Sequence, residues 1–568
     1  MTNYQFAGGT ICAPATIPGT GAISIIRVSG KESLAIADKV IDTKGVPIAE
    51  TEGYRLRYGT VFEADGSVLD NVIVSVFRAP HSYTGENSVE ISCHASRFIV
   101  NKILELLVNA GARIAAPGEF TRRAFVNGKM DLAQAEAVAD VIASQSAASH
   151  RVAMNQLKGG FSSELKVLRE KLLTMTSLLE LELDFSEEDV EFASRKELGQ
   201  LVDDSLTHIG RLTASFSRGN AIKNGVPVAI VGATNTGKST LLNALLGEER
   251  AIVSDIAGTT RDTIEETLNI DGILFRFIDT AGIRETDETI EKIGIDRTFK
   301  KLGEATVVLG MTDLSRGEAA VLEDADFILS KVNEMGGVKN VGTENDGAET
   351  GWAPLAGTDG ASLAGTDRTS LAETGGASGS ETGGTPLAET GGASQHGHGA
   401  GQERKVVILV NKCDVAGDFY RDDNGTGYGS GNDLGENMAE IGGNKNVNHD
   451  NNIVSLIENK YDNCKVIPIS AKTGKGLSTL TKTLGEIGSE ITGSTDETLV
   501  TNVRHYEALV RAASALERVR AGLHIATLPP DLIAQDLREA LYHLGEIVGE
   551  ISTDETLGNI FRNFCIGK

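Results

Sequence analysis

A run of apolar residues that leads directly into a glycine-rich loop constrains the fold of this chain more than any other feature. The loop, residues 232–240, reads GATNTGKST and follows the run PVAIVG. It matches the pattern GxxxxGK[ST] in a strand–loop–helix context, where backbone N–H groups wrap around phosphates at a helix N-terminus. Lys238 then reaches the outer phosphates, and the Ser239 hydroxyl binds Mg²⁺. The segment predicts an α/β nucleotide-binding domain.

Two further motifs follow in the order that a GTP-binding domain requires. In the segment IAGTTRD, residues 256–262, we choose Thr260 as the residue that places its hydroxyl and carbonyl against Mg²⁺ and the terminal phosphate. In FIDTAG, Asp279 ends a predicted strand as an outer partner of Mg²⁺, and the Gly282 amide can sense the terminal phosphate. The sequence therefore predicts that these two segments are the nucleotide-sensitive switches.

The choice of base is predicted by the tetrapeptide NKCD, residues 411–414, which follows the apolar run VVILV. Asp414 can accept both N–H groups of guanine, whereas adenine would leave the carboxylate unsatisfied. The tripeptide SAK at 470–472, after KVIPI, completes the purine pocket. The predicted magnesium ligands are Ser239 and Thr260. The residues predicted to contact GTP are Asn235, Thr236, Gly237, Lys238, Ser239, Thr240, Ser254, Asp255, Ile256, Ala257, Gly258, Thr259, Thr260, Asp279, Thr280, Ala281, Gly282, Asn411, Lys412, Asp414, Ser470, Ala471 and Lys472.

Hydrolysis requires a group other than the glutamine that orients the attacking water in Ras-like switches, because that position is Ile283 here. Asn235, within the phosphate-binding loop, could help to hold a monovalent cation against the phosphates and so supply the charge that an arginine finger supplies elsewhere. The acidic segment 285–291 follows the second switch and could order the water. From spacing alone, a solvated charged loop stays open as the alternative for this segment.

Length and composition bound the rest of the chain. A chain of 568 residues exceeds what one hydrophobic core normally serves, so we expect three or more domains. The five cysteines are scattered without a CxxC pair, so neither a disulfide framework nor a zinc site is predicted. The net charge of -26 means that nucleic acid must be met by a local basic patch or through a partner. Because no long apolar run and no basic leader are present, we expect a cytoplasmic protein without a membrane segment.

The pattern of predicted secondary structure changes along the chain in a way that indicates an inserted domain. Residues 1–120 read as a compact α+β unit, 121–220 as helical, 221–490 as α/β, and 491–568 as helical again. Helices on both sides of the α/β block predict that a GTP-binding domain is inserted into a helical domain whose two halves pack together. Apolar residues at alternating spacings of three and four predict a long packed helix, with the seam Leu165, Leu168, Leu172, Met175 and Leu179.

Two polar stretches interrupt the α/β block. Within the segment 338–402, residues 355–394 hold an eight-residue repeat such as LAETGGAS. With at most one leucine per repeat, it cannot bury enough apolar surface to offset the entropy of ordering. We interpret it as a disordered acidic loop, with a small β-solenoid as the alternative. Residues 418–452 have the same character, and neither stretch is expected to carry chemistry.

Several long segments outside the nucleotide motifs are distinctive. They are RVSG at 27–30, SYTGENSVEI at 82–91, PGEFTRRAFVNGKMDLAQAEAVADVI at 117–142, LGEIVGE at 544–550 and FCIGK at 564–568, together with GTTRD and DTAGIRE of the switches. On these segments the chain, apart from the two polar stretches, resembles the tRNA-modification GTPases called MnmE or TrmE. Such long and widely separated matches are specific, whereas the nucleotide motifs alone would fit many translation GTPases. Two departures from the family are Ala95-Ser96, where the family usually has two glycines, and the long insertion before NKCD.

The resemblance implies a potassium site and a catalytic glutamate. Asn235, together with Ser254, Ile256 and Thr259, would bind K⁺, and K⁺ would promote pairing of the GTP-binding domains and hydrolysis. Glu291 aligns with the catalytic glutamate of the family.

The resemblance also implies a constitutive homodimer, formed through the N-terminal domain, and a site there for 5-formyltetrahydrofolate or a related one-carbon folate. Arg27, Glu90, Lys129 and Lys568 match the positions that touch the folate. A pterin edge suits a carboxylate such as Glu90, while arginine and lysine suit the folate's own carboxylates. Taken without the family, each of the four would be interpreted as a surface ion. For Cys565 the resemblance suggests a role in the modification chemistry, and a small buried hydrophobe is the alternative.

By resemblance, the reaction is addition of a carboxymethylaminomethyl or aminomethyl group at carbon 5 of the tRNA wobble uridine, with the folate as one-carbon donor. A flavin-dependent partner of the MnmG or GidA type would bring FAD and much of the tRNA contact in a heterotetramer, which suits the acidic charge of this chain. GTP turnover would then drive opening and closing of the GTP-binding domains rather than the organic step.

Two other functions remain open at this stage. A regulatory GTPase in ribosome assembly has no evident use for the folate segments or for the terminal CIGK. A one-carbon folate enzyme with a vestigial GTP-binding domain is disfavoured by the intact Lys238, Ser239 and Asp414.

Overall fold

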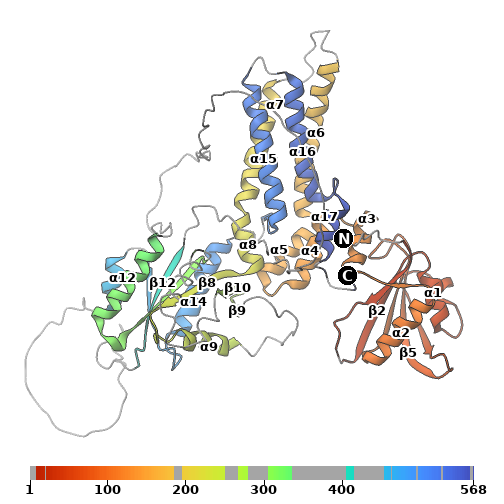
Figure 1. Cartoon of the computed structure of the whole chain (residues 1–568), viewed down its shortest axis with the longest axis horizontal. Helices are drawn as coiled ribbons and strands as arrows, with labels where there is room; N and C mark the ends of the chain where they lie inside the picture. The colour runs from red at the N-terminus through yellow and green to blue at the C-terminus, as the bar shows by residue number, and fades with distance from the viewer. Residues whose placement is uncertain are drawn as a thin grey trace, which may run out of the picture.

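The structure is a computed structural model, and it describes residues 8–19, 21–184, 195–249, 266–278, 303, 305–334, 404–414, 453–461, 464–493, 497–525, 529–562, 564 and 567. The octad repeat, the second polar stretch and both predicted switches lie outside these residues. Within them, the chain forms an N-terminal α+β domain, a helical domain and an α/β domain, and the two sheet domains lie on opposite sides of the helices (Figure 1). The predicted multidomain fold class is confirmed.

The N-terminal domain is a sheet with helices packed on one face. Its described strands follow the order β3-β4-β5-β6-β2-β1-β7. Alternate residues of β2, β5 and β6 form one apolar core with helices α1 and α2, as the period-two pattern of half-buried strands requires. The elements are β1 (Ile11–Pro14), β2 (Ile23–Ser29), α1 (Ser33–Val40), β3 (Ile41–Asp42), η1 (Ile48–Glu50), β4 (Arg55–Phe62), β5 (Val68–Phe77), β6 (Ser88–His94), α2 (Arg97–Asn109) and β7 (Arg113–Ile114).

The helical domain is built from both ends of the remaining chain. Four long helices, α6, α7, α15 and α16, run side by side (Figure 1) and share one core. The predicted seam lies in α6, where its four leucines are buried and Met175 is partly buried against the same core. The elements are α3 (Glu119–Val126), α4 (Leu132–Ala143), α5 (Ala147–Leu157), α6 (Gly160–Asp184), α7 (Arg195–Ala214), α8 (Phe216–Asn224), α15 (Val503–Leu523), α16 (Pro530–Val548) and α17 (Asp554–Arg562).

The α/β domain has the layered form of a doubly wound sheet. Its described strands follow the order β13-β12-β11-β8-β10-β9, and only the β9–β10 pair is antiparallel. Two separate apolar cores, one on each face, cover the sheet. The elements are β8 (Val226–Gly232), α9 (Lys238–Glu249), β9 (Glu266–Ile270), β10 (Ile273–Ile278), β11 (Val307–Asp313), η3 (Leu314–Arg316), α12 (Glu318–Glu334), β12 (Lys405–Asn411), α13 (Ile453–Lys460), β13 (Cys464–Pro468) and α14 (Leu477–Thr492).

The entry and exit of the α/β domain lie next to each other. The chain enters through α8 and returns at Val500, whose N–H donates to the Ser215 hydroxyl at 3.0 Å just before α8 begins. The Gln156 side chain of α5 donates to the Leu499 carbonyl at 3.0 Å. The α/β domain is therefore inserted into the helical domain, as the alternation of patterns predicted. Among the described helices, none is long and apolar enough to cross a membrane.

Candidate functional site

The phosphate-binding loop joins β8 to α9 at the carboxyl edge of the parallel strands, where ligands of such sheets bind. Helix α9 begins at Lys238, so its first N–H groups face the loop. Asn235 and Gly237 both have left-handed backbone, with φ of +62° and +100°. Gly237 must be glycine for a second reason, because a Cβ there would lie 2.5 Å from Asn411 Nδ2.

The Lys238 ammonium folds back over this loop. Nζ donates to the carbonyls of Gly232 at 2.9 Å and Ala233 at 2.7 Å, and the side chain is half-buried. Burial lowers the pKa of Lys238. The positive charge is thus held at the loop, where a phosphate would meet it together with the N-terminus of α9.

The buried side chain of Asn411 ties three predicted motifs together. Its Nδ2 donates to the Thr236 carbonyl at 2.7 Å, and its Oδ1 accepts from the Ala471 N–H at 3.0 Å. The phosphate loop, NKCD and SAK segments therefore meet at one edge of the sheet. Ser470 is buried in the turn after β13, and its N–H donates to the Lys475 carbonyl at 2.9 Å.

The structure describes only some of the other residues that are predicted to bind the nucleotide. Ser239 and Thr240 lie in the first turn of α9, Asp414 is half-buried at the end of NKCD, and Lys472 is exposed. The predicted catalytic Glu291 lies outside the described residues, and so do the remaining nucleotide residues: Ser254, Asp255, Ile256, Ala257, Gly258, Thr259, Thr260, Asp279, Thr280, Ala281 and Gly282.

A second cluster lies on the N-terminal sheet around Arg27. The register of β2 and β6 places Arg27 opposite Glu90, and its Nε donates to Glu90 Oε1 at 3.0 Å. The guanidinium carbon lies 5.2 Å from the centroid of the Tyr83 ring and 5.7 Å from that of Phe120. This is a charged pair held against aromatic rings, whose cation–π contacts fix the guanidinium in place.

The C-terminal tail completes this cluster. An Arg27 terminal nitrogen donates to the Gly567 carbonyl at 3.3 Å. Gly567 has φ of +98°, and a Cβ there would lie 2.0 Å from the Pro14 carbonyl oxygen. Lys129 Nζ donates to the Pro80 carbonyl at 3.1 Å, in the loop that carries Tyr83. Cys565 and Lys568 lie outside the described residues.

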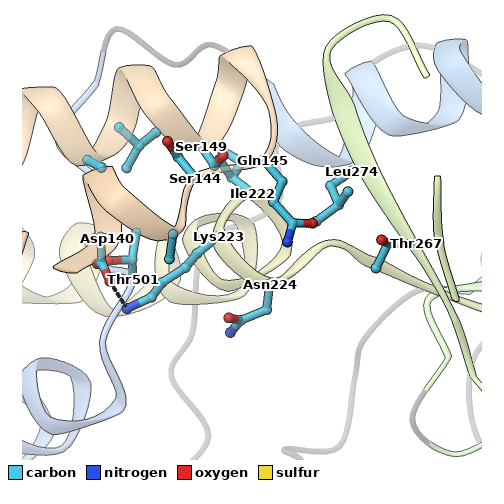
Figure 2. Close-up of a pocket in the computed structure, with 13 residues that line it drawn as sticks. Asp140, Ser144, Gln145, Ser149, Ile222, Lys223, Asn224, Thr267, Leu274 and Thr501 are labelled. Atoms are coloured by element: carbon cyan, nitrogen blue, oxygen red, sulfur yellow. Dashed lines mark ion pairs between the residues drawn. The ribbon is translucent and has the colours of Figure 1, made fainter. Parts of the chain in front are cut away.

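A hollow of about 260 Å³ lies between the α/β domain and the helical domain (Figure 2). Asp140 and Lys223 form a 2.8 Å ion pair on its wall, and Thr501 is hydrogen-bonded to Gln156. Ser144 and Ser149 donate to backbone carbonyls of their own turn. These polar groups of the wall therefore already have partners within the protein, and none of the lining residues belongs to the nucleotide motifs.

Sequence reasoning did not single out several residues of these clusters. Tyr83 and Phe120 lie inside segments that carry the family resemblance, but no spacing places their rings under Arg27. Asp313 pairs with Lys412 of NKCD at 2.6 Å. The signal for Asp313 was an acidic residue at the end of a largely apolar strand, VVLGMTD, at the edge where the other motifs lie.

The parallel sheet, the phosphate loop with its lysine and the joined NKCD and SAK segments define a GTP-hydrolysing protein of the P-loop class. The description "MnmE helical domain" fits residues 132–565, and "GTP-binding protein TrmE N-terminus" fits residues 10–129. The chain belongs to the MnmE (TrmE) family of tRNA-modification GTPases.

Relatives match over nearly the full length. The tRNA modification GTPase MnmE of Parabacteroides distasonis is 43% identical over 98% of this chain and 100% of its own length. The protein of the same name from Porphyromonas gingivalis is 41% identical over 100% of this chain and 99% of its own. A GTP-binding protein of Sulfolobus solfataricus in complex with GDP aligns with 58% of this chain and 67% of its own at 14% identity, with a TM-score of 0.24, which is too low to support a conclusion.

Proposed function

We propose that this protein is a potassium-stimulated GTPase that adds a carboxymethylaminomethyl or aminomethyl group at carbon 5 of the tRNA wobble uridine. It acts with a flavin-dependent MnmG/GidA-type partner and takes its carbon from a one-carbon folate. The observation that carries the proposal is that one chain of this family holds two sites. One is the nucleotide edge, where the phosphate loop meets the NKCD and SAK segments. The other is the N-terminal cluster around Arg27 and Glu90.

The nucleotide edge fits the ions that the proposal requires. Ser239, in the first turn of α9, offers a hydroxyl for Mg²⁺ beside the phosphate loop. Asn235 is exposed at the loop with left-handed backbone, so its side-chain oxygen is available to a monovalent cation together with Ser254, Ile256 and Thr259. These ions supply positive charge to the phosphates, while Lys238 and the loop amides bind and orient them.

The N-terminal cluster fits a folate. Glu90 offers a carboxylate to the donor edge of a pterin, and Arg27 lies across two aromatic rings with its other side toward the C-terminal tail. Lys129 and Lys568 supply positive charge for the carboxylates of the folate, and Cys565 is assigned to the modification chemistry.

An apolar stripe on the same sheet face supports the homodimer. Leu56 is 67% exposed, Tyr58 66% and Ile73 48%. The strand registers place Tyr58 opposite Ile73, and Arg27 and Glu90 on the same side of the sheet, opposite to the helix-covered side. Contiguous exposed apolar side chains of this kind mark interfaces.

Tyr58→Asp is expected to dissociate the dimer in analytical ultracentrifugation, and an unchanged sedimentation coefficient would exclude this face.

The cation site is tested by exchange of salts. Replacement of Na⁺ by K⁺ is expected to raise GTP hydrolysis strongly in the wild type and little in Asn235→Ala, because the side-chain oxygen of Asn235 is a ligand of the cation. The exposed Asn220→Ala on α8 is the matched control. An equal response of the wild type and Asn235→Ala would remove the potassium site.

The reaction itself is tested by mass analysis of tRNA nucleosides from cells that lack this protein. Loss of the modified wobble uridine, restored by the wild type and not by Arg27→Ala, is expected. Persistence of full modification in the absence of the protein would overturn the proposed pathway.

A further inference from the structure

The acidic residue that ends β11 lies beside the base-recognition motif. Asp313 pairs directly with Asn411 in the register of the parallel strands β11 and β12. Both residues are the last of their strands, so they lie at the carboxyl edge where the phosphate loop leaves β8. Asp313 is 5% exposed, and a buried carboxylate requires partners.

Both oxygens of the Asp313 carboxylate have partners. Oδ2 accepts from Lys412 Nζ at 2.6 Å. Oδ1 accepts from the Ser315 N–H at 3.0 Å and from its hydroxyl at 2.6 Å. Burial alone would raise the pKa of Asp313, but the Lys412 and Ser315 hydrogen bonds outweigh it and lower the pKa. The short η3 turn thus fixes a charged group, which in turn holds the Lys412 side chain.

The backbone of Lys412 needs such support. Its φ of +63° lies in the left-handed region, which is strained for a non-glycine residue. On its N-terminal side, Asn411 is held by Thr236 and Ala471. On its C-terminal side, the Cys413 N–H donates to the Ile469 carbonyl at 3.3 Å. This turn sets the direction in which Asp414 leaves the sheet.

We propose that Asp313 is a positioning residue of the guanine pocket: through its ion pair with Lys412, it holds NKCD in the conformation that lets Asp414 face the base. The proposal rests on the assignment of NKCD to guanine. Asp313 itself does not touch the nucleotide. Its removal should therefore change how well the pocket distinguishes bases, because Asp414 would lose its fixed distance to the N1–H and the 2-amino group.

The test uses the full-length chain and two nucleotides, GDP and IDP, which differ only in the 2-amino group of the base. Asp313→Asn is expected to weaken GDP binding roughly tenfold and to reduce the preference for GDP over IDP, as measured by calorimetry. The matched control is Asp324→Asn, which removes the carboxylate that pairs with Arg316 at 3.0 Å in the same region and does not contact NKCD. It should keep both the affinity and the preference.

A purely structural role for Asp313 would lower the unfolding temperature and leave the GDP:IDP ratio unchanged, and that result overturns the proposal. If Asp313→Asn does not fold, Ser315→Ala removes the hydroxyl that donates to Asp313 Oδ1 at 2.6 Å and should lower the same ratio. Asp414→Ala distinguishes a failure of the assignment of NKCD to guanine from a failure of the role of Asp313. If it keeps the full preference for GDP, the assignment of NKCD fails, whereas loss of the preference in Asp414→Ala alone refutes only the role of Asp313.

Discussion

The nucleotide edge and the N-terminal cluster are both binding sites built on a sheet, but they are assembled in opposite ways. At the nucleotide edge, each contributing loop is a contiguous motif that follows a parallel strand, and the strands bring the loops together at one edge. The N-terminal cluster joins single residues, and the contact between Arg27 and Gly567 spans 540 positions of the chain. A contiguous motif is visible in a sequence, whereas a site of single residues depends on register and on the path of the tail.

The largest effect is expected at the nucleotide edge. Lys238→Ala removes the ammonium that lies 2.7 Å from the Ala233 carbonyl over the phosphate loop. The loss of one fixed positive group at a developing charge should lower kcat for GTP hydrolysis about 10³-fold. Folate binding by equilibrium dialysis should stay at the wild-type level, because the N-terminal cluster uses none of these residues.

Exposed Lys482→Ala on α14 is the control for this variant. A Lys238→Ala protein that also lost folate binding would break the comparison, because the two sites would then not be independent.

The second largest effect is expected on stability, at a buried cluster that joins α4 to α15. Glu136 of α4 accepts from Arg504 at 2.8 Å and lies 2.6 Å from His505 Nε2, across 368 positions or more. Arg504 also donates to the Glu546 and Ile547 carbonyls at the end of α16. Glu136→Gln leaves the mostly buried guanidinium of Arg504 without its charge partner. This change should lower the free energy of unfolding by about 3 kcal/mol.

The dependence of this loss on pH can be stated with its sign. Burial would raise the pKa of Glu136, but His505 and Arg504 lower it from an ordinary 4.5 to about 2. The carboxylate therefore contributes its full stability above pH 4.5 and loses the contribution as the pH falls towards 2. Denaturant titrations should show the difference between wild type and Glu136→Gln shrinking over that interval. A difference that is constant with pH would contradict the role of the carboxylate.

What the sequence could predict follows the same division. The phosphate loop, NKCD and SAK were predicted because each carries its chemistry within a few residues, and the structure brings these segments together through Asn411. The seam of α6 was predicted because helical periodicity is a local property, and its leucines are buried. The insertion of the α/β domain followed from the change of pattern at its two ends.

The remaining features could not be predicted, for physical reasons. The pairing of Arg27 with Glu90 depends on the antiparallel register of β2 and β6, which no local pattern specifies. The residues themselves were known only through the family resemblance. Asp313 was missed because a single carboxylate at the end of a largely apolar strand is also typical of a solvated strand end.

The third prediction acts on the tail of the N-terminal cluster. Gly567→Ala would place a Cβ 2.0 Å from the Pro14 carbonyl, so the tail should leave its position and withdraw its carbonyl from Arg27. Strain of this size should weaken folate binding about 30-fold, or about 2 kcal/mol. Gly66→Ala is the matched control, because Gly66 also has positive φ, +85°, but no atom lies within 4 Å of its added Cβ. Equal folate affinity in the two variants would show that tail docking does not contribute to the site.

The smallest effect is expected at Lys129. The sequence alone favoured a surface ion at this position, whereas the family resemblance implied a contact with the folate. Its Nζ donates an exposed hydrogen bond to the Pro80 carbonyl at 3.1 Å. Because such a bond contributes little to stability, Lys129→Ala should leave the unfolding temperature unchanged. If the ammonium binds a folate carboxylate, its removal should weaken folate binding about tenfold. Lys39→Ala is the matched control, since Lys39 Nζ also donates to a carbonyl, that of Ala110 at 3.4 Å, on an exposed part of the same domain. Isothermal titration of both variants decides between the interpretations: identical affinities would leave Lys129 a surface ion and restrict the cluster to Arg27, Glu90 and the tail.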